Sequence, residues 1–218
     1  MTLSPPTILN RPVTNGESLA LPGADVRLRP GWLDANSADA LLGVLLDGLP
    51  WEVHRIRLFG RQVDSPRLSC WIGDADAVYR YSGTRFEPHP WSAALAELRE
   101  RLQAETGARF NSVLANRYRD GRDAMGWHSD DEPELGPQPL IASISLGAER
   151  RFLLKHRREA GYRAGLPLPH GSLLLMAGDT QRNYRHALPR TAKPVGERIN
   201  LTFRWIAPGH HKSGARMA

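Results

Sequence analysis

The first amphipathic pattern along the chain predicts a helix that ends near Pro50. Four leucines recur at helical spacing after Ser37, a residue type that commonly caps helices, so we expect the helix to begin there. The stripe consists of Leu41, Leu42, Leu45 and Leu49. Their shared face should pack against the core of the protein.

A second leucine stripe predicts a helix that begins at Pro90-Trp91. Leu95, Leu98 and Leu102 fall on one face of this segment. Gly107 follows at the position where a left-handed residue commonly ends a helix. The sequence therefore predicts two helices, separated by about forty residues of a different pattern.

Outside these helices, short apolar segments alternate with turn residues, which is the pattern of β-strands. Asp120-Gly121 and Gly178-Asp179 are two of the turns that separate them. The expected strands are Trp71-Ile72, Val78–Tyr81, Ser112–Tyr118, Ile141–Leu146, Arg151–Leu154, Ser172–Met176 and Ile199–Trp205. Many short strands at such spacing favour a sandwich or barrel, so we expect a mainly β protein with flanking helices, of the α+β class.

The two ends of the chain differ in composition from its middle. Residues 1–30 are rich in Pro, Gly, Thr and Asn, which predicts an irregular N-terminal extension with room for one short strand. Residues 208–218 contain Gly, His, Lys and Ser and should form a flexible tail. Residues 31–207 lie between them and should form one domain, because domains usually hold roughly 100–200 residues.

Charge and cysteine content narrow the class of protein. A formal net charge of +6 and a pI near 10.0 make a polyanion such as nucleic acid a plausible partner, although many soluble proteins are basic. Cys70 is the single cysteine and cannot form an intramolecular disulfide, so we expect it to be a small buried side chain. We expect the protein to occupy a reducing compartment, the cytosol or, in a eukaryote, the nucleus. Without an apolar run of roughly 18 residues, the chain should be soluble, and we expect a monomer.

His128-Ser129-Asp130 is the first candidate for chemistry. Residues i and i+2 of an extended chain point to the same side, so the imidazole and the carboxylate can reach one ion. Eight histidines and 23 acidic residues among 218 predict roughly one such pair by chance, so a solvated surface pair remains an alternative.

A metal site with two histidines and one carboxylate needs a third ligand from a distant strand, and it leaves positions open for cosubstrates. His186 lies 58 residues after His128 (186 − 128) and is preferred because of the segment that follows it. His89, His156 and His170 remain alternatives on distance grounds.

The segment Arg198–Trp205 alternates polar and apolar side chains. Period two places Arg198, Asn200, Thr202 and Arg204 on one face, opposite an apolar face of ordinary core residues. The polar face is either solvated or part of a pocket, since arginine can grip a carboxylate of a dicarboxylic cosubstrate with two hydrogen bonds.

Asn116 and Tyr118 share one face of another expected strand, where an amide and a hydroxyl could complete such a pocket. The pieces follow one another in a recognisable order. They are Asn116-x-Tyr118-x-Asp120-Gly121, Gly126-Trp127-His128-Ser129-Asp130-Asp131-Glu132, Ile141–Gly147, His170-Gly171-Ser172-Leu173, His186-Ala187-Leu188-Pro189 and Arg198–Arg204. Taken together they resemble the AlkB family of Fe(II)/2-oxoglutarate dioxygenases, particularly its members that act on duplex DNA, over about residues 50–206.

The resemblance implies a double-stranded β-helix, or jelly roll, with helices on one side. It implies a DNA oxidative demethylase that removes alkyl groups of the 1-methyladenine and 3-methylcytosine type with Fe(II), O2 and 2-oxoglutarate, releasing succinate, CO2 and an aldehyde. His128, Asp130 and His186 would bind iron, and Arg198 would pair with the distal carboxylate of 2-oxoglutarate. The remaining pocket residues would be Asn116, Tyr118, Thr202 and Arg204, of which Arg204 is also expected to be catalytic.

The resemblance also implies a base-binding lid at about residues 50–89. Tyr79, Tyr81 and Ser82 match the family's stretch that contacts a flipped base, whereas spacing alone would favour a core pair of tyrosines. Phe59 lies among arginines that include Arg67, which suits an apolar wedge between bases flanked by phosphate contacts. A hairpin with a buried phenylalanine is the alternative.

Asp131 and Glu132 would contact an exocyclic amino group of the base, or would be solvated. The same chemistry on RNA or single strands remains an alternative substrate. A nucleic-acid-binding protein without catalysis would not need the complete set of His128, Asp130, His186 and the two arginines. A hydroxylase of proteins or small molecules would not need the aromatic lid or the positive charge.

Overall fold

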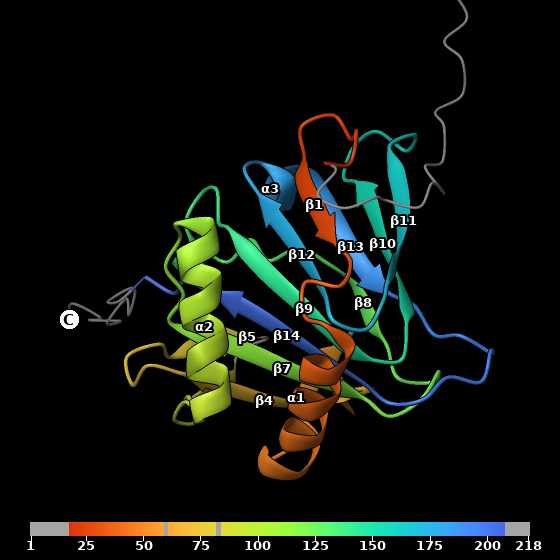
Figure 1. Ribbon diagram of the computed structural model, residues 1–218. Helices are drawn as coiled ribbons and strands as arrows, with labels where there is room; N and C mark the ends of the chain where they lie inside the picture. Colours follow the sequence, from red (N-terminus) through yellow and green to blue (C-terminus); the bar gives the residue numbers. More distant parts are fainter. Residues whose placement is uncertain (1–17, 59–60, 82–83, 208–218) are drawn as a thin grey trace, which may run out of the picture.

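The computed structural model describes residues 18–58, 61–81 and 84–207, and only the backbone of residues 55–58, 61–62, 79–81 and 84–86. Two antiparallel sheets form the two layers of a jelly roll (Figure 1). The large sheet has the order β1-β12-β9-β14-β7-β4. Its strands are β1 (Asp25–Arg29), β12 (Ser172–Ala177), β9 (Ile141–Gly147), β14 (Arg198–Arg204), β7 (Ser112–Tyr118) and β4 (Leu68–Gly73).

The small sheet has the order β11-β10-β13-β8 and lies opposite the large one. Its strands are β11 (Arg163–Leu168), β10 (Arg150–His156), β13 (Tyr184–Leu188) and β8 (Met125–His128). Two hairpins fall within the expected lid, and they consist of β2 (Arg55–Leu58) with β3 (Arg61–Asp64) and β5 (Tyr79–Tyr81) with β6 (Thr84–Phe86). The mainly β class expected from the sequence is confirmed.

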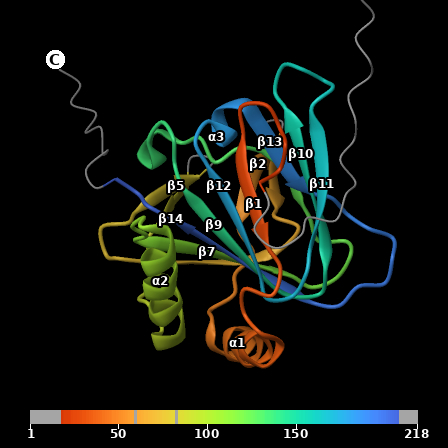
Figure 2. The same cartoon turned by 45° about the horizontal axis from the view of Figure 1, so that its top comes forward.

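Helices α1 (Ala35–Gly48) and α2 (Ala93–Thr106) cover one face of the large sheet (Figures 1 and 2). The predicted leucine stripes supply their buried faces. They share one core cluster with the apolar side chains of the sheet, including Leu45, Leu95, Leu98, Leu102, Ile144 and Phe203. Two shorter helical segments, η1 (Pro133–Leu135) and α3 (Thr180–Asn183), complete the described elements.

The ends of α1 and α2 correct one prediction and confirm another. Ser37 is not the cap of α1, because Asp34 takes that position and its Oδ1 accepts a hydrogen bond from the Ser37 nitrogen at 3.0 Å. Ser92 caps α2 in the same way, directly after Pro90-Trp91. Gly107 ends α2 with φ of 68°, in the left-handed region that was expected of it.

Strand β14 lies in the middle of the large sheet, between β9 and β7, and all seven of its residues are buried. Ile199, Leu201 and Phe203 pack in the core beneath the helices. The alternate side chains, from Arg198 to Arg204, therefore point between the two sheets and are not a solvated face.

A second core cluster lies between the sheets at the end where β1 pairs with β12, and it includes Leu19, Val26 and Leu28. The packed domain therefore extends at least back to Leu19, whereas the sequence suggested residue 31 as its start. The first seventeen residues and the expected tail 208–218 lie outside the described residues. In the described part of the chain, no helix has both the length and the apolar character required to cross a membrane.

Three of the four strands of the small sheet escape the sequence pattern. Strands β8 (Met-Gly-Trp-His), β13 (Tyr-Arg-His-Ala-Leu) and β11 (Arg-Ala-Gly-Leu-Pro-Leu) are short and mix charged, glycine and proline residues into the alternation. Their outward side chains include Trp127, Arg163 and Arg185, which are exposed, so these strands lack a regular apolar alternation. Tertiary pairing with β10, the one strand of this sheet that the pattern predicts, keeps them extended.

Candidate active site

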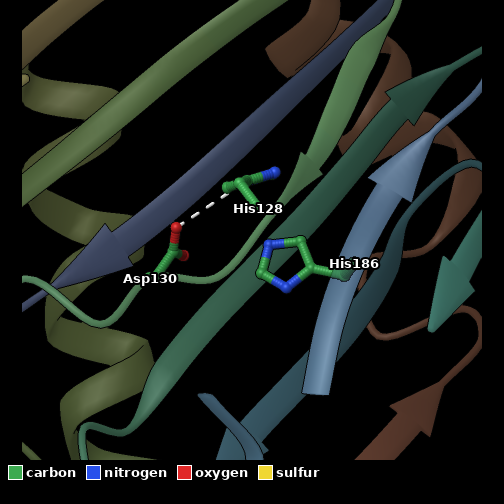
Figure 3. A group of neighbouring side chains, drawn as sticks. All are labelled: His128, Asp130 and His186. Atoms are coloured by element: carbon green, nitrogen blue, oxygen red, sulfur yellow. Dashed lines mark ion pairs between the residues drawn. The ribbon is translucent and has the colours of Figure 1, made fainter. Parts of the chain in front are cut away.

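The predicted metal ligands come together between the two sheets (Figure 3). His128 is the last residue of β8, Asp130 follows two residues later, and His186 lies on β13 directly across from His128 in the strand register. One ligand atom from each of the three lies within 4.8 Å of the others. His128 Nε2 lies 3.6 Å from Asp130 Oδ1.

Burial of His186 and the charges around Asp130 give these two groups the protonation states that a metal requires. Burial lowers the pKa of His186 to about 3, an effect to which His128 adds, so the imidazole is neutral at physiological pH. Burial alone would raise the pKa of the Asp130 carboxyl, but Arg204 and the two histidines hold that pKa well below its usual range. A neutral imidazole and an ionised carboxylate are the forms that bind a cation.

Neighbouring groups fix the orientation of the ligands. Arg204 Nη2 donates to Asp130 Oδ2 at 2.8 Å, and the Asp130 backbone nitrogen donates to Gln181 Oε1 at 3.0 Å. His128 Nδ1 lies 2.9 Å from the carbonyl oxygen of Gly126, which directs Nε2 toward the other two ligands. Ser129, between the two ligands, donates to the Tyr184 carbonyl oxygen at 2.8 Å.

Arg198 lies beside this group and is 1% exposed. Its Nη2 donates to Ser145 Oγ and to Asn200 Oδ1, both at 2.8 Å, whereas its Nε has no hydrogen-bond partner among the described residues. Burial lowers the pKa of Arg198 to about 10, so the guanidinium stays charged at neutral pH. A buried cation with an unused donor fits an anionic ligand, since burial without a partner is costly.

One cavity contains both the three ligands and the predicted cosubstrate residues. It is lined by Asn116, Tyr118, His128, Asp130, His186, Arg198, Thr202 and Arg204, and also by Met125, Ser143, Phe152, Met176, Leu188 and Asn200. The alternation of β7 and β14 thus brings Asn116, Tyr118 and the polar residues of β14 to the same place, as their spacing suggested.

Sequence reasoning missed several of these residues. Gln181, which holds the Asp130 backbone, comes from the four-residue helix α3 and has no signal in the sequence. Phe152 could have been found, because the alternation of β10 turns it inward, and its ring centroid lies 5.2 Å from that of His186. Together with Met125 and Leu188 it forms an apolar wall of the cavity.

The alternative third ligands lie elsewhere. The His156 Nδ1 accepts hydrogen bonds from the backbone nitrogens of residues 158 and 159, at 3.3 and 3.0 Å. His170 accepts from the Gly147 nitrogen at 2.8 Å and lies near Asp39. His89 is exposed and joins β4 through its backbone. None of the three belongs to the ligand group of the described residues.

The expected substrate residues have a mixed outcome. Phe59 and Ser82 lie outside the described residues, and the side chains of Tyr79 and Tyr81 on β5 do as well. Arg67 is 6% exposed and its Nε donates to Asn116 Oδ1 at 2.8 Å, so it supports the pocket and is not placed on the surface as a phosphate contact would be.

Asp131 and Glu132 follow the ligand Asp130 directly. Asp131 forms an ion pair with Arg157 of the β10–β11 turn, and its side chain is 49% exposed. Glu132 occupies the N-cap position of η1. Asp131 is therefore tied to the basic turn, an interaction that neither of the two sequence interpretations included.

A jelly roll with two histidines, one aspartate and a buried arginine between its sheets defines the class of Fe(II)/2-oxoglutarate-dependent oxygenases. The family model of the 2OG-Fe(II) oxygenase superfamily matches residues 25–204. Within this superfamily, the chain belongs to the AlkB family of dioxygenases.

Two human proteins illustrate the similarity. Alpha-ketoglutarate-dependent dioxygenase alkB homolog 3 of Homo sapiens is 38% identical over 213 residues, which cover 93% of this chain and 74% of that protein. DNA oxidative demethylase ALKBH2 of Homo sapiens is 42% identical over 159 residues, which cover 70% of this chain and 61% of that protein.

Solved structures support the fold. The structure of OsALKBH1 superimposes with a TM-score of 0.59 and 16% identity, covering 83% of this chain and 96% of that one. An oxidoreductase of the 2OG-Fe(II) oxygenase family from Burkholderia pseudomallei superimposes with a TM-score of 0.54 and 16% identity, covering 84% and 87% of the two chains.

Fe(II) and 2-oxoglutarate fit the residues present. The His-Asp-His group offers the two nitrogens and one oxygen that suit iron while leaving positions open, and the partnerless Arg198 Nε offers a donor to a carboxylate. When bound, iron and 2-oxoglutarate supply the activation of dioxygen. The protein contributes the orientation of the ligands and the apolar wall that excludes water.

Proposed function

We propose that this dioxygenase removes alkyl groups from the ring nitrogens of nucleic-acid bases. The observation that carries the proposal is the His-Asp-His group beside a buried cation in a chain similar to a DNA oxidative demethylase. In this reaction the N-methyl carbon gains one oxygen atom from O2, the other enters succinate, and 2-oxoglutarate loses CO2. The resulting hemiaminal breaks its C–N bond and releases formaldehyde with the restored base.

Each pocket residue has a role in this proposal. His128, Asp130 and His186 bind Fe(II), and Arg204 keeps Asp130 ionised and oriented. Arg198 pairs with the distal carboxylate of 2-oxoglutarate. Asn116, Tyr118 and Thr202 line the remaining wall of the same cavity.

The target base must leave its stack to reach this cavity, because the metal ligands lie between two sheets. In the proposal, Tyr79, Tyr81 and Ser82 contact the flipped base, and Phe59 occupies the gap that it leaves in a duplex. The lesions are of the 1-methyladenine and 3-methylcytosine type in DNA. The same chemistry on RNA or single strands is the second candidate, because an unpaired base can reach the cavity without being flipped out of a duplex.

Mass spectrometry of methylated oligonucleotides tests the proposal. DNA and RNA strands that carry one methylated base, alone and in a duplex, are incubated with Fe(II), ascorbate and 2-oxoglutarate. We expect the mass to fall by one methylene, with one succinate formed per base restored. The His128→Ala variant serves as the inactive control, and His170→Ala, which alters a histidine outside the ligand group, should stay active.

The pattern of products decides between the candidates. Turnover of DNA but not RNA supports repair of DNA, and the reverse supports RNA as the substrate. Binding of the oligonucleotides without loss of any methyl group would contradict the proposed enzyme and leave a nucleic-acid-binding protein.

A further inference from the structure

The outer face of the small sheet carries a groove of about 650 Å³. Six of its described lining residues are cations and none is acidic. The cations are Arg151, Lys155, Arg157, Arg158, Arg163 and Arg185. Trp127 adds an aromatic surface, since its side chain stays 41% exposed and Lys155 Nζ lies 4.2 Å from its ring centroid.

The alternation of the strands places this groove next to the metal-binding group. Trp127 and Arg185 are the chain neighbours of the ligands His128 and His186, so they point to the opposite face of the same two strands. Strand β8 is the edge of the small sheet. A strand of nucleic acid can therefore pass around this edge without crossing the sheet.

A contact at one end of the groove joins it to the site. Arg157 lines the groove and forms an ion pair with Asp131, the residue after the ligand Asp130. At the other end, Arg151 and Gly165 also line a second hollow of about 470 Å³, to which Arg190 and Lys193 contribute. Positive charge thus predominates from Arg157 to Lys193, although the acidic residue Glu149 also lines the second hollow.

The chemistry of this surface matches a nucleic-acid strand. Phosphates complement clustered cations, and an exposed indole ring offers a face on which a base can stack. Burial in the core cannot explain Trp127, because its ring is exposed and its near contact is a lysine. An acidic peptide would satisfy the charges but would not use the ring.

We propose that this basic groove binds the strand that flanks the flipped base, with its cations on phosphates and Trp127 stacked on one base. The proposal rests on the proposed function, since it names a second contact for the same substrate. It assigns positioning to the groove, and the metal-binding cavity alone performs the chemistry.

Salt dependence of binding tests the cations. The Lys155→Ala/Arg185→Ala variant is compared with Arg27→Ala/Arg122→Ala, which also removes two charges but lies away from the groove. Fluorescence anisotropy of a labelled single strand of about 15 nucleotides gives the affinity at several salt concentrations. For the groove variant we expect the negative slope of log K against log salt to become shallower by about 1.4, since each phosphate contact in a single strand contributes about −0.7.

A tryptophan pair tests the stacking. We expect Trp127→Ala to weaken binding by about 5- to 150-fold, whereas Trp127→Phe keeps a ring and loses less. DNA and RNA strands of one sequence show which polymer the groove prefers. Consumption of 2-oxoglutarate without nucleic acid reports on the fold of the metal site in each variant.

The outcomes separate the groove from the enzyme activity. If the affinity for the strand falls equally in the groove variant and the control variant, the proposed binding groove is wrong. It is also wrong if poly-glutamate displaces the labelled strand more readily than an unlabelled strand does. Demethylation with unchanged binding in all groove variants also rejects it. Groove-dependent binding without any demethylation keeps the groove and rejects the proposed function.

Discussion

Arg198 is among the largest fully buried side chains of the described residues, although arginine is normally exposed. Its Nη2 donates hydrogen bonds to Ser145 and Asn200, whereas its Nε has no hydrogen-bond partner among the described residues. The charge stays on because the pKa, although lowered to about 10, is still well above neutral. At the scale of the residue, burial thus leaves Arg198 as a charged group with an unused donor, which suits an anionic ligand.

Replacement of Arg198 by alanine should raise the KM for 2-oxoglutarate by about 10- to 150-fold, because hydrogen bonds to charged groups contribute about 1.5–3 kcal/mol. Succinate formation at varied 2-oxoglutarate measures this. Arg198→Lys keeps the charge but loses the planar guanidinium, so its KM for 2-oxoglutarate should lie between those of the wild type and Arg198→Ala. An unaltered KM in Arg198→Ala would remove this residue from the cosubstrate pocket.

Burial also disfavours the charged form of Cys70, and here it keeps the group neutral. It is 2% exposed, and burial, with a smaller effect of Glu52, raises the pKa of its thiol to about 12. Thiolate is the reactive form, so iodoacetamide should label the native protein very slowly at pH 8 and the urea-unfolded chain rapidly. Mass spectrometry of the labelled protein checks this, and rapid labelling of the native state would show that Cys70 is accessible.

The same shift predicts a pH dependence. The pKa of Cys70 is raised in the folded state above the ordinary value of 9.0, so the unfolded chain releases this proton first as the pH rises. Its contribution to the free energy of unfolding is complete below about pH 9 and is lost between about pH 9 and 12. Urea unfolding of the wild type and of Cys70→Ala at pH 8 and pH 10 checks this. The free energy of unfolding should decrease less between the two pH values in the variant than in the wild type.

At the scale of the element, two helical glycines make a matched pair. Gly43 lies inside α1, and Gly107 ends α2 with φ of 68°. At both positions an added Cβ would lie in open space. Alanine at position 43 should stabilise the protein by about 0.5–1 kcal/mol, because it reduces the freedom of the unfolded chain.

Alanine at position 107 should destabilise the protein by about 1–2 kcal/mol, because it must adopt a left-handed backbone. Since no atom beyond the local backbone lies within 4 Å of the added carbon at either site, the difference arises from backbone conformation. Urea unfolding measures both free energies. A stabilising Gly107→Ala would mean that α2 does not end in the described conformation.

Elements differ in how far the sequence predicts them. The leucines of α1 and α2 repeat at the helical period, and β7 was predicted with both its ends, because their buried faces require regular apolar spacing. Strands β8, β11 and β13 were missed, because their neighbours in the sheet and not their own side chains keep them extended. The predicted N-cap of α1, Ser37, was wrong because the nearby Asp34 is an equally good capping residue type and takes that position.

At the scale of the whole molecule, the site joins the two sheets. His128 and His186 come from the small sheet, whereas Arg198 and Arg204 come from the large one, and Arg204 bonds Asp130 across the gap. Ligands that bind here should therefore stabilise the entire fold.

Mn(II), used in place of oxidisable Fe(II), together with 2-oxoglutarate should raise the melting temperature. A ligand at a hundred times its Kd adds about 2.7 kcal/mol to the free energy of unfolding. Differential scanning fluorimetry measures the shift, which EDTA should reverse. His128→Ala should show little shift with the same ligands, and a shift equal to wild type would argue against the assigned metal ligands.

The sequence by itself determined which residues are chemically capable, namely the two histidines, Asp130 and the arginines of β14, because residue type and alternation are properties of the chain. It left open which histidine is the third ligand and whether the polar face of β14 is solvated. Only the tertiary structure decided these points, since pairing β13 with β8 sets His186 opposite His128, and packing of the small sheet over β14 excludes water from Arg198. Distances between residues far apart in the chain depend on strand pairing, which no local pattern contains.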